Sequence, residues 1–214
     1  MARSTAQRVA DALRDRIEDG GLPPGTQLSE EALGRDIGVS RNTLREAFRL
    51  LVHESLVVHR LNRGVFVRVL ESADVTDIYR VRGALETAGV RAAAGAPRAL
   101  RAAVTDAVDR AERAAADGDW RGVGSADLAF HRALAALSGS PRIDAAMDRL
   151  LAELRLAFHA MPSPRLFHQA FLARNRALAE LLEQGAYGSA EAELTTYLDD
   201  ARQLILDAMR EAAT

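Results

Sequence analysis

The chain has 214 residues, of which 48% are apolar, and its formal net charge is −2, so one or two domains with ordinary hydrophobic cores are expected. The absence of cysteine excludes disulfides and thiolate metal sites, and no apolar run reaches the ~18 residues that a membrane-spanning helix requires. The first twenty residues also lack the apolar core of a signal peptide, which predicts a cytoplasmic protein with no membrane partner.

Two short helices are predicted in the first forty residues. The first covers residues 5–18, where apolar side chains recur at helical spacing, and the helix breakers of GGLPPG end it. The second begins after Ser29, an expected N-cap, and it carries Glu30 and Glu31 in its first turn, where the helix dipole favours negative charge. Gly38 is expected to end this helix.

A third helix is predicted from Ser40, another N-cap, to about His53. Its inward face carries the apolar residues at spacing i, i+4, i+7, namely Leu44, Phe48 and Leu51. Its outward face carries Arg41, Arg45 and Arg49, with Asn42 beside them. Residues 40–70 have a net charge of +4, whereas the segments before and after them are acidic. This local positive charge indicates an anionic partner for this segment.

Two short helices joined through one glycine are typical of a helix-turn-helix. The following sequence LVVHRLNRGVFVRV contains two β-rich runs, Leu56–Arg60 and Val65–Val69. Asn62, Arg63 and Gly64 can form the turn of a hairpin between them. The hairpin is therefore predicted to be the wing of a winged helix-turn-helix.

An arginine row on a helix is frequently only a solvated face, and that explanation stays open for the row by itself. The capped helix before the row and the hairpin after it favour DNA binding instead. A helix of this kind fits the major groove, where arginine reaches guanine edges, asparagine reaches adenine, and the remaining cations neutralise phosphates.

The run PPGTQLSEEALGRDIGVSRNTLREAFRLLVHESLVVHRLNRGVFV, Pro23 to Val67, resembles the winged helix-turn-helix of GntR-family bacterial transcription regulators. This resemblance implies double-stranded operator DNA as the partner. It places DNA contacts on the third helix and the wing, at Ser40, Arg41, Asn42, Thr43, Arg45, Arg49, Asn62, Arg63 and Gly64. The chain has Glu31 where the family often has a basic residue, and Arg35 is expected to supply the phosphate contact in its place. Asn42 and Thr43 stand where the family often has a small residue and a proline, so base preference is expected to differ.

The sequence after Leu70 is almost entirely helical in pattern. Helices are predicted at residues 73–94, 98–116, 119–137, 142–160, 164–184 and 189–212. The predicted fold class is therefore mostly α, with an N-terminal winged helix-turn-helix over residues 1–70 and an antiparallel all-α helical bundle over residues 71–214. Bundles of this kind place ligand sites between facing helices, so an effector-binding and dimerisation domain is expected.

The segments DIYRVRGALETAGVRAAA and DLAFHRALAALSGSPRI resemble the FCD effector domain of the FadR-like GntR branch. Many relatives hold a metal there through an Asp and a His four residues apart and one His on each of two later helices. Asp127 and His131 match the first pair, but Asn175 and Tyr197 occupy the positions of the later histidines. Two strong donors form an incomplete set, so no cofactor is expected beyond a weakly bound divalent metal. His168 precedes Asn175 by two helical turns, ~10 Å, and is expected to be too far away to substitute.

The resemblance also implies that an effector is bound by Arg82, Glu86, Asp127, His131, Asn175 and Tyr197. Two alternatives stay open from the residues alone. Asp127 and His131 can be a hydrogen-bonded polar pair inside the bundle, and Arg82 and Glu86 can be a surface salt bridge at i, i+4 spacing. The expected effector class is a small carboxylate, although this expectation depends on the metal.

The favoured function is a ligand-responsive transcription regulator that binds a palindromic operator as a homodimer. The alternative is a metal-assisted hydrolase in the helical domain with an accessory DNA-docking domain. The sequence lacks an HExxH motif, a Gly-rich phosphate loop and a complete metal set, so no enzyme is expected. A non-specific architectural DNA binder would be broadly basic, whereas this chain is acidic outside one segment.

Overall fold

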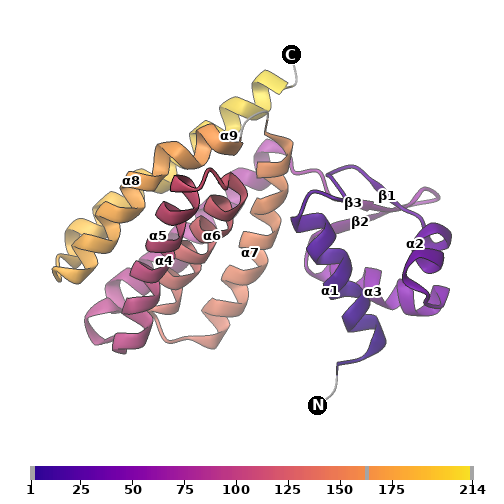
Figure 1. Cartoon of the computed structure of the whole chain (residues 1–214), viewed down its shortest axis with the longest axis horizontal. Coiled ribbons are helices and arrows are strands. Elements are labelled where there is room, and N and C mark those ends of the chain that lie inside the picture. The colour runs from indigo at the N-terminus through magenta and orange to yellow at the C-terminus, as the bar shows by residue number, and fades with distance from the viewer. Residues whose placement is uncertain (1–2, 162–163, 213–214) are drawn as a thin grey trace. The chain divides into compact units, whose positions relative to one another are not determined.

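The structure is a computed structural model that describes residues 3–161 and 164–212. It contains two compact units, one formed by residues up to Glu71 with Ala152–Ala160, the other by Ser72–Leu151 and the residues from Met161 onward. The predicted fold class is confirmed, since a winged helix-turn-helix precedes an all-α bundle (Figure 1). In the part of the chain described, no helix combines the length and apolar character needed to cross a membrane.

The first unit contains three helices and a three-stranded antiparallel sheet. The helices are α1 (Thr5–Glu18), α2 (Glu30–Ile37) and α3 (Arg41–His53), and the strands are β1 (Gln27–Leu28), β2 (Val57–Arg60) and β3 (Gly64–Val67). The strand order is β1-β3-β2, with Gln27 opposite Phe66. The hairpin of β2 and β3 was predicted, but β1 was not, because a two-residue strand has no periodicity of its own.

Local capping fixes where α2 and α3 begin and end. Ser29 Oγ accepts a hydrogen bond from the Ala32 amide at 3.2 Å, and Ser40 Oγ accepts one from the Thr43 amide at the same distance. Gly38 ends α2 with a φ of 75°, a left-handed conformation that costs glycine no steric strain. Both predicted N-caps and the predicted glycine stop are confirmed.

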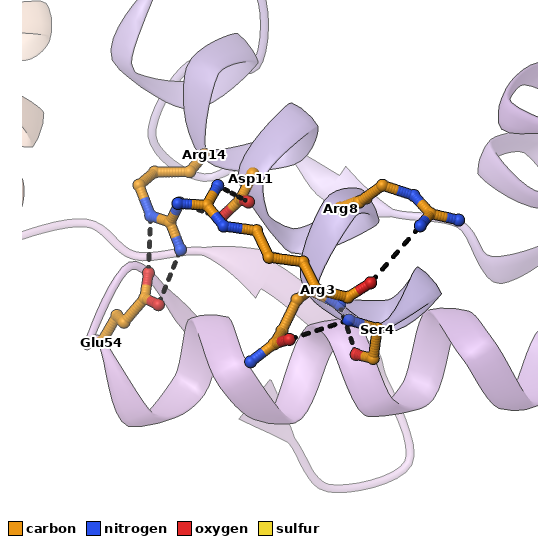
Figure 2. A network of polar contacts seen from close by, with 7 residues as sticks. Arg3, Ser4, Arg8, Asp11, Arg14 and Glu54 are labelled. Atoms are coloured by element: carbon orange, nitrogen blue, oxygen red, sulfur yellow. Dashed lines mark hydrogen bonds and ion pairs between the residues drawn. The ribbon is translucent and has the colours of Figure 1, made fainter. Parts of the chain in front are cut away.

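Helix α1 packs on α3 through buried apolar side chains. The buried residues are Val9, Leu13 and Ile17 of α1 and Leu44, Phe48 and Leu51 of α3. Arg14 adds a polar connection, because its guanidinium donates to both carboxylate oxygens of Glu54 at 2.7 and 2.8 Å and to Asp11 at 2.7 Å (Figure 2). This two-pronged geometry joins α1 to the C-terminal cap of α3 and so helps to hold α3 in place.

The second unit is built from long helices. They are α4 (Ser72–Ala92), a 3-10 turn (Ala93–Gly95), α5 (Arg98–Ala116), α6 (Trp120–Ala136), α7 (Pro141–Ala160, whose last nine residues belong to the first unit), α8 (Pro164–Glu183) and α9 (Tyr187–Ala212). Helix α6 packs against α4, α5 and α8, and α9 packs against α4 and α8. The six predicted helices are therefore present, and α6 lies among three others.

Helices α4 and α6 approach closely at Gly89. A Cβ atom at this position would overlap the carbonyl oxygen of Leu134, so only glycine permits the observed separation. One turn earlier on the same two helices, Glu86 and His131 meet. The close approach therefore brings together two of the predicted effector-binding residues.

Candidate functional site

Helix α3 presents its arginines to solvent. Leu44, Phe48 and Leu51 are buried beneath the helix, and Arg41, Arg45 and Arg49 are exposed on the opposite side together with Asn42. Ser40 and Thr43 lie at the N-terminus, where the two hydroxyls are 2.9 Å apart. The exposed end and face of α3 therefore carry the donors that a major-groove helix uses.

Three arginines of α2 and α3 pair with carboxylates in different ways. Arg45 donates from Nε to Glu30 Oε1 of α2 at 2.9 Å. Arg49 pairs with Glu46 on its own helix at 2.6 Å. The predicted phosphate contact Arg35 is exposed and lies 3.5 Å from Glu31, one turn earlier on α2.

The wing turn has the backbone expected of a tight hairpin. Asn62 and Gly64 have φ values of 57° and 95°, and the Gln27 side-chain amide donates to the Arg63 carbonyl at 2.8 Å. The guanidinium carbons of Arg60 and Arg63 lie 4.9 and 5.9 Å from the centre of the Phe66 ring. These cation–π contacts hold two positive charges beside Phe66 on the wing.

The sequence identified neither the Phe66 contact nor the role of Gln27. The ten residues predicted to bind DNA lie on the exposed parts of α2 and α3, at the N-cap of α3 or in the wing turn. A groove of about 750 Å³ lies between α3 and the sheet and is lined by residues that include Glu30, Arg45, Phe48, Arg49, His59 and Val65. The two predicted DNA-contacting elements therefore border one surface of a single unit.

A second group of chemically active side chains lies inside the bundle. It is called the buried polar cluster here and consists of Arg82 and Glu86 of α4, Asp127 and His131 of α6, His168 and Asn175 of α8, and Tyr197 of α9. Each of these residues is at most 4% exposed. The alternative in which Arg82 and Glu86 form a surface salt bridge is therefore wrong, because both lie in the core.

Glu86 is the link between Arg82 and His131. Arg82 Nε donates to Glu86 Oε1 at 2.9 Å, and Glu86 Oε2 lies 2.7 Å from His131 Nδ1. Arg82 also lies over the ring of Tyr79, 4.7 Å from its centre. Both oxygens of this buried carboxylate are thus engaged, which offsets the cost of removing its charge from water.

Tyr197 of α9 contacts both cluster residues of α6, His131 and Asp127. Its hydroxyl lies 3.2 Å from His131 Nε2 and donates to Asp127 Oδ1 at 3.4 Å. The same oxygen accepts a hydrogen bond from Asn175 Nδ2 at 2.8 Å. Within the described residues, Arg82 Nη2 and Asn175 Oδ1 have no hydrogen-bond partner. The cluster therefore keeps an unused donor on Arg82 and an unused acceptor on Asn175.

Both carboxylates of the cluster are ionised at neutral pH. Burial alone would raise the pKa of Asp127, but the neighbouring His168 ring, the charge of His131 and the hydrogen bond from Asn175 hold that pKa well below its ordinary 3.8. Burial likewise acts against ionised Glu86, whose pKa is nevertheless lowered by His131 and Arg82. Burial raises the pKa of Tyr197 well above its usual 10.0, so its hydroxyl stays neutral.

His168 was expected to lie too far from Asn175 to replace a metal ligand there, but the structure brings its ring beside Asp127. Its Nδ1 atom lies 3.5 Å from Asp127 Oδ2. The reason is a glycine on the facing helix: a Cβ at Gly124 would lie 2.8 Å from His168 Nε2, so the missing side chain makes room for the ring. Counting turns along one helix could not reveal this, because the approach depends on how α8 packs on α6.

The metal site that the FCD resemblance implies does not fit these residues. Asn175 directs its amide hydrogens, not its oxygen, toward Asp127, and Tyr197 offers a neutral hydroxyl. Within residues 3–161 and 164–212, no group of three or more His, Asp or Glu side chains is arranged to hold a metal ion. Asp127 and His131 are both buried in the bundle, as the open alternative has it, but they are 3.9 Å apart and are joined through the Tyr197 hydroxyl instead of by a hydrogen bond to each other.

A separate cavity of about 630 Å³ lies elsewhere in the bundle unit. Its lining includes Arg98, Arg101, Thr105, Glu183 and Tyr187, and none of the residues predicted to bind an effector. Thr105 donates to Glu183 at 2.6 Å across it. The cavity and the buried polar cluster are therefore two distinct places in the unit.

Comparisons with known proteins agree with both halves of this description. Residues 5–67 match the model of "Bacterial regulatory proteins, gntR family", and residues 77–200 match that of the FCD domain. The crystal structure named as a transcriptional regulator GntR from Rhodococcus sp. RHA1 is 45% identical, with a TM-score of 0.89 over 96% of this chain and 99% of that one.

Two curated relatives carry more specific names. The "Probable D-xylose utilization operon transcriptional repressor" of Paenarthrobacter nicotinovorans is 28% identical over 92% of this chain and 88% of its own length. The "Gluconate operon transcriptional repressor" of Bacillus licheniformis is 42% identical, but over only 39% of this chain and 34% of its own length. The similarity thus extends over nearly the whole chain in one case and over a single segment in the other.

Proposed function

The chain belongs to the GntR family of bacterial regulatory proteins and carries an FCD domain, and on that premise we propose that it binds a palindromic operator as a homodimer whose DNA affinity changes when a small molecule binds the helical domain. The family consists of transcription regulators and not of enzymes, so the metal-assisted hydrolase is set aside. The proposed place of action is the cytoplasm, where the operator DNA is.

The observation that carries the DNA-binding part is the exposed face of α3. Arg41, Arg45 and Arg49 project from a helix that is capped at Ser40 and packed on α1 through its opposite face. In this proposal the residues of α3 read base edges in the major groove, and Arg63 at the wing contacts the backbone. Arg35 supplies a further phosphate contact from α2.

Dimerisation is proposed because one winged unit makes few contacts. A module of about 70 residues buries roughly 600–1,000 Å² on DNA, and two-fold pairing doubles both phosphate and base contacts. Residues 71–214 are the proposed dimerisation domain. Sedimentation of the full chain should then give twice its 23.1 kDa mass.

The effector site is proposed at the buried polar cluster. Arg82 Nη2 is a fixed cationic donor without a partner among the described residues, and it suits one oxygen of a small carboxylate. A carboxylate is also the class to which gluconate, in the name of one relative, belongs. Entry of such a ligand requires the cluster residues to move, because all of them are buried.

A thermal-shift screen tests the effector proposal. Small acids and sugars are added to the full-length protein alone and to the protein bound to its operator. A ligand that binds the folded helical domain raises the melting temperature, by an amount set by its concentration relative to Kd. An Arg82→Met variant should lose the shift caused by acids. Acid-induced shifts of equal size in this variant would place the effector elsewhere, for example in the cavity near Arg101.

A further inference from the structure

Three of the arginines predicted to bind DNA form ion pairs on α2 and α3, and the ion pair of Arg45 differs from those of Arg35 and Arg49. Arg49 pairs with Glu46 three residues earlier, and Arg35 pairs with Glu31 four residues earlier, so both pairs stay within one helix. Arg45 instead reaches Glu30 on the preceding helix, 15 residues earlier in the chain. Its side chain is thus tied to a second element of the helix-turn-helix.

The position of Glu30 is itself well defined. Glu30 is the first residue of α2, directly after the N-cap Ser29, and its side chain is 32% exposed. The left-handed turn at Gly38 sets the direction of α3 relative to α2. The carboxylate is therefore a fixed acceptor beside the exposed face of α3.

The contact uses only part of the Arg45 guanidinium. Nε donates to Glu30, which leaves the Nη1 and Nη2 atoms, and the Arg45 side chain is 61% exposed. A bidentate contact to guanine O6 and N7 needs two parallel N–H groups, and the edge formed by Nη1 and Nη2 provides them. The ion pair thus orients Arg45 and leaves its Nη1 and Nη2 groups available for a guanine.

We propose that Glu30 is a positioning residue for Arg45 and that it sets base specificity by holding the guanidinium in its reading orientation before DNA arrives. The proposal rests on the proposed function, in which α3 reads the operator. An unrestrained arginine side chain loses conformational entropy when it binds a base, and this loss weakens the contact. An arginine that is already held by an ion pair loses less entropy on binding. The carboxylate also repels phosphates, so Glu30 lowers non-specific affinity while it raises discrimination.

The test compares two substitutions of neighbouring glutamates. Glu30→Gln and Glu31→Gln each remove one negative charge from the first turn of α2, but Glu30 pairs with Arg45 of α3, whereas Glu31 pairs with Arg35 of its own helix. Wild type, both variants and Arg45→Ala are used to select from a random duplex library, and each is titrated with non-specific DNA. Thermal melting checks that every variant is folded.

Both glutamine variants should gain non-specific affinity. Only Glu30→Gln should lower the discrimination between bases, by about two- to tenfold, at one position of each half-site. This should be the same position at which Arg45→Ala abolishes base preference. The double variant with both Glu30→Gln and Arg45→Ala should lose no more discrimination at that position than Arg45→Ala alone, because the glutamate acts through the arginine.

Three outcomes would overturn the inference. Unchanged base preference in Glu30→Gln would show that the ion pair has no role in reading, and tighter specific binding with intact preference would show that Glu30 masks Arg45. An equal loss of preference in Glu31→Gln would assign the effect to helix charge. If the wild-type protein itself selects no sequence, the proposed function fails, and this result is distinct from all three.

Discussion

The hydroxyl of Tyr197 lies 3.2 Å from Nε2 of His131, where the FCD resemblance leads one to expect a metal ligand. Asn175, at the other position that matches a family histidine, donates to Asp127 at 2.8 Å. Both side chains therefore point at the Asp127–His131 pair and replace metal coordination by hydrogen bonds. This arrangement allows a direct test by substitution.

Restoring histidine at both positions should create a metal site. The Asn175→His, Tyr197→His double variant offers one carboxylate and three imidazoles, a set that binds Zn²⁺ strongly. Zinc should raise the melting temperature of this variant and leave that of the parent unchanged. Stoichiometric zinc in elemental analysis of the untagged parent would contradict the assignment, because the natural residues would then suffice.

Arg45→Ala should remove base preference at one position of each half-site. A bidentate arginine–guanine contact is worth roughly 1–3 kcal/mol, and a dimer loses two of them. Competition titrations between preferred and scrambled duplexes measure the loss. If Arg45→Ala still prefers the wild-type sequence by the same ratio, α3 reads DNA through other residues.

Arg63→Ala should act differently, because its expected partner is the DNA backbone. Binding should weaken similarly for all sequences, and the slope of log K against log salt should fall by about one unit for each phosphate that the wing no longer neutralises. Fluorescence anisotropy at several salt concentrations gives this slope. A change in sequence preference with an unchanged slope would instead place Arg63 on a base.

The approach of α4 to α6 predicts opposite effects of two alanine substitutions on one helix. At Gly89 an added Cβ meets the Leu134 carbonyl, whereas at Gly83 the nearest atom is 3.9 Å away. Gly89→Ala should lower the free energy of unfolding by about 1–3 kcal/mol through overpacking. Gly83→Ala should raise it by about 0.5–1 kcal/mol, since alanine is the better helix former. Urea unfolding that shows equal effects would refute the close approach of the two helices.

Acid should destabilise the protein partly through the buried carboxylates. Folding lowers the pKa values of Asp127 and Glu86. The stability that their ionisation contributes is therefore fully present above the ordinary pKa values of 3.8 and 4.5, and it is lost as pH falls through the pKa values of the folded state. Asp127→Asn should be less stable than wild type at pH 7, yet lose less stability between pH 5 and pH 3. Asp77→Asn, whose side chain is exposed, serves as the control and should follow the wild-type curve. An Asp127→Asn curve parallel to wild type would contradict this account.

The sequence specified the helix-turn-helix almost completely because its signals are local. Ser29, Gly38 and Ser40 act within one turn of themselves, and each has the predicted role. Strand β1 was not predicted, because Gln27 acquires its strand conformation only by pairing with Phe66, which is distant in sequence. Local patterns therefore predict helix ends well and short non-local strands poorly.

Six of the seven residues of the buried polar cluster were predicted, but His168 and the geometry of the cluster were not. The FCD resemblance identified Asp127 and the residues that meet it from α8 and α9, Asn175 and Tyr197. It did not identify His168, whose approach to Asp127 depends on the absence of a side chain at Gly124 on a facing helix. Nor could an i, i+4 spacing decide whether Arg82 and its partner lie inside the bundle, because the same spacing occurs on buried and exposed faces.

The central claim is that two copies of α3 read a two-fold operator, and selection by the full-length protein from a random duplex library tests it most directly. The account predicts enrichment of an inverted repeat whose half-sites are related by two-fold symmetry, with a bound mass of two chains per duplex. A single unrepeated motif, or no enriched motif with one chain per duplex, would contradict it.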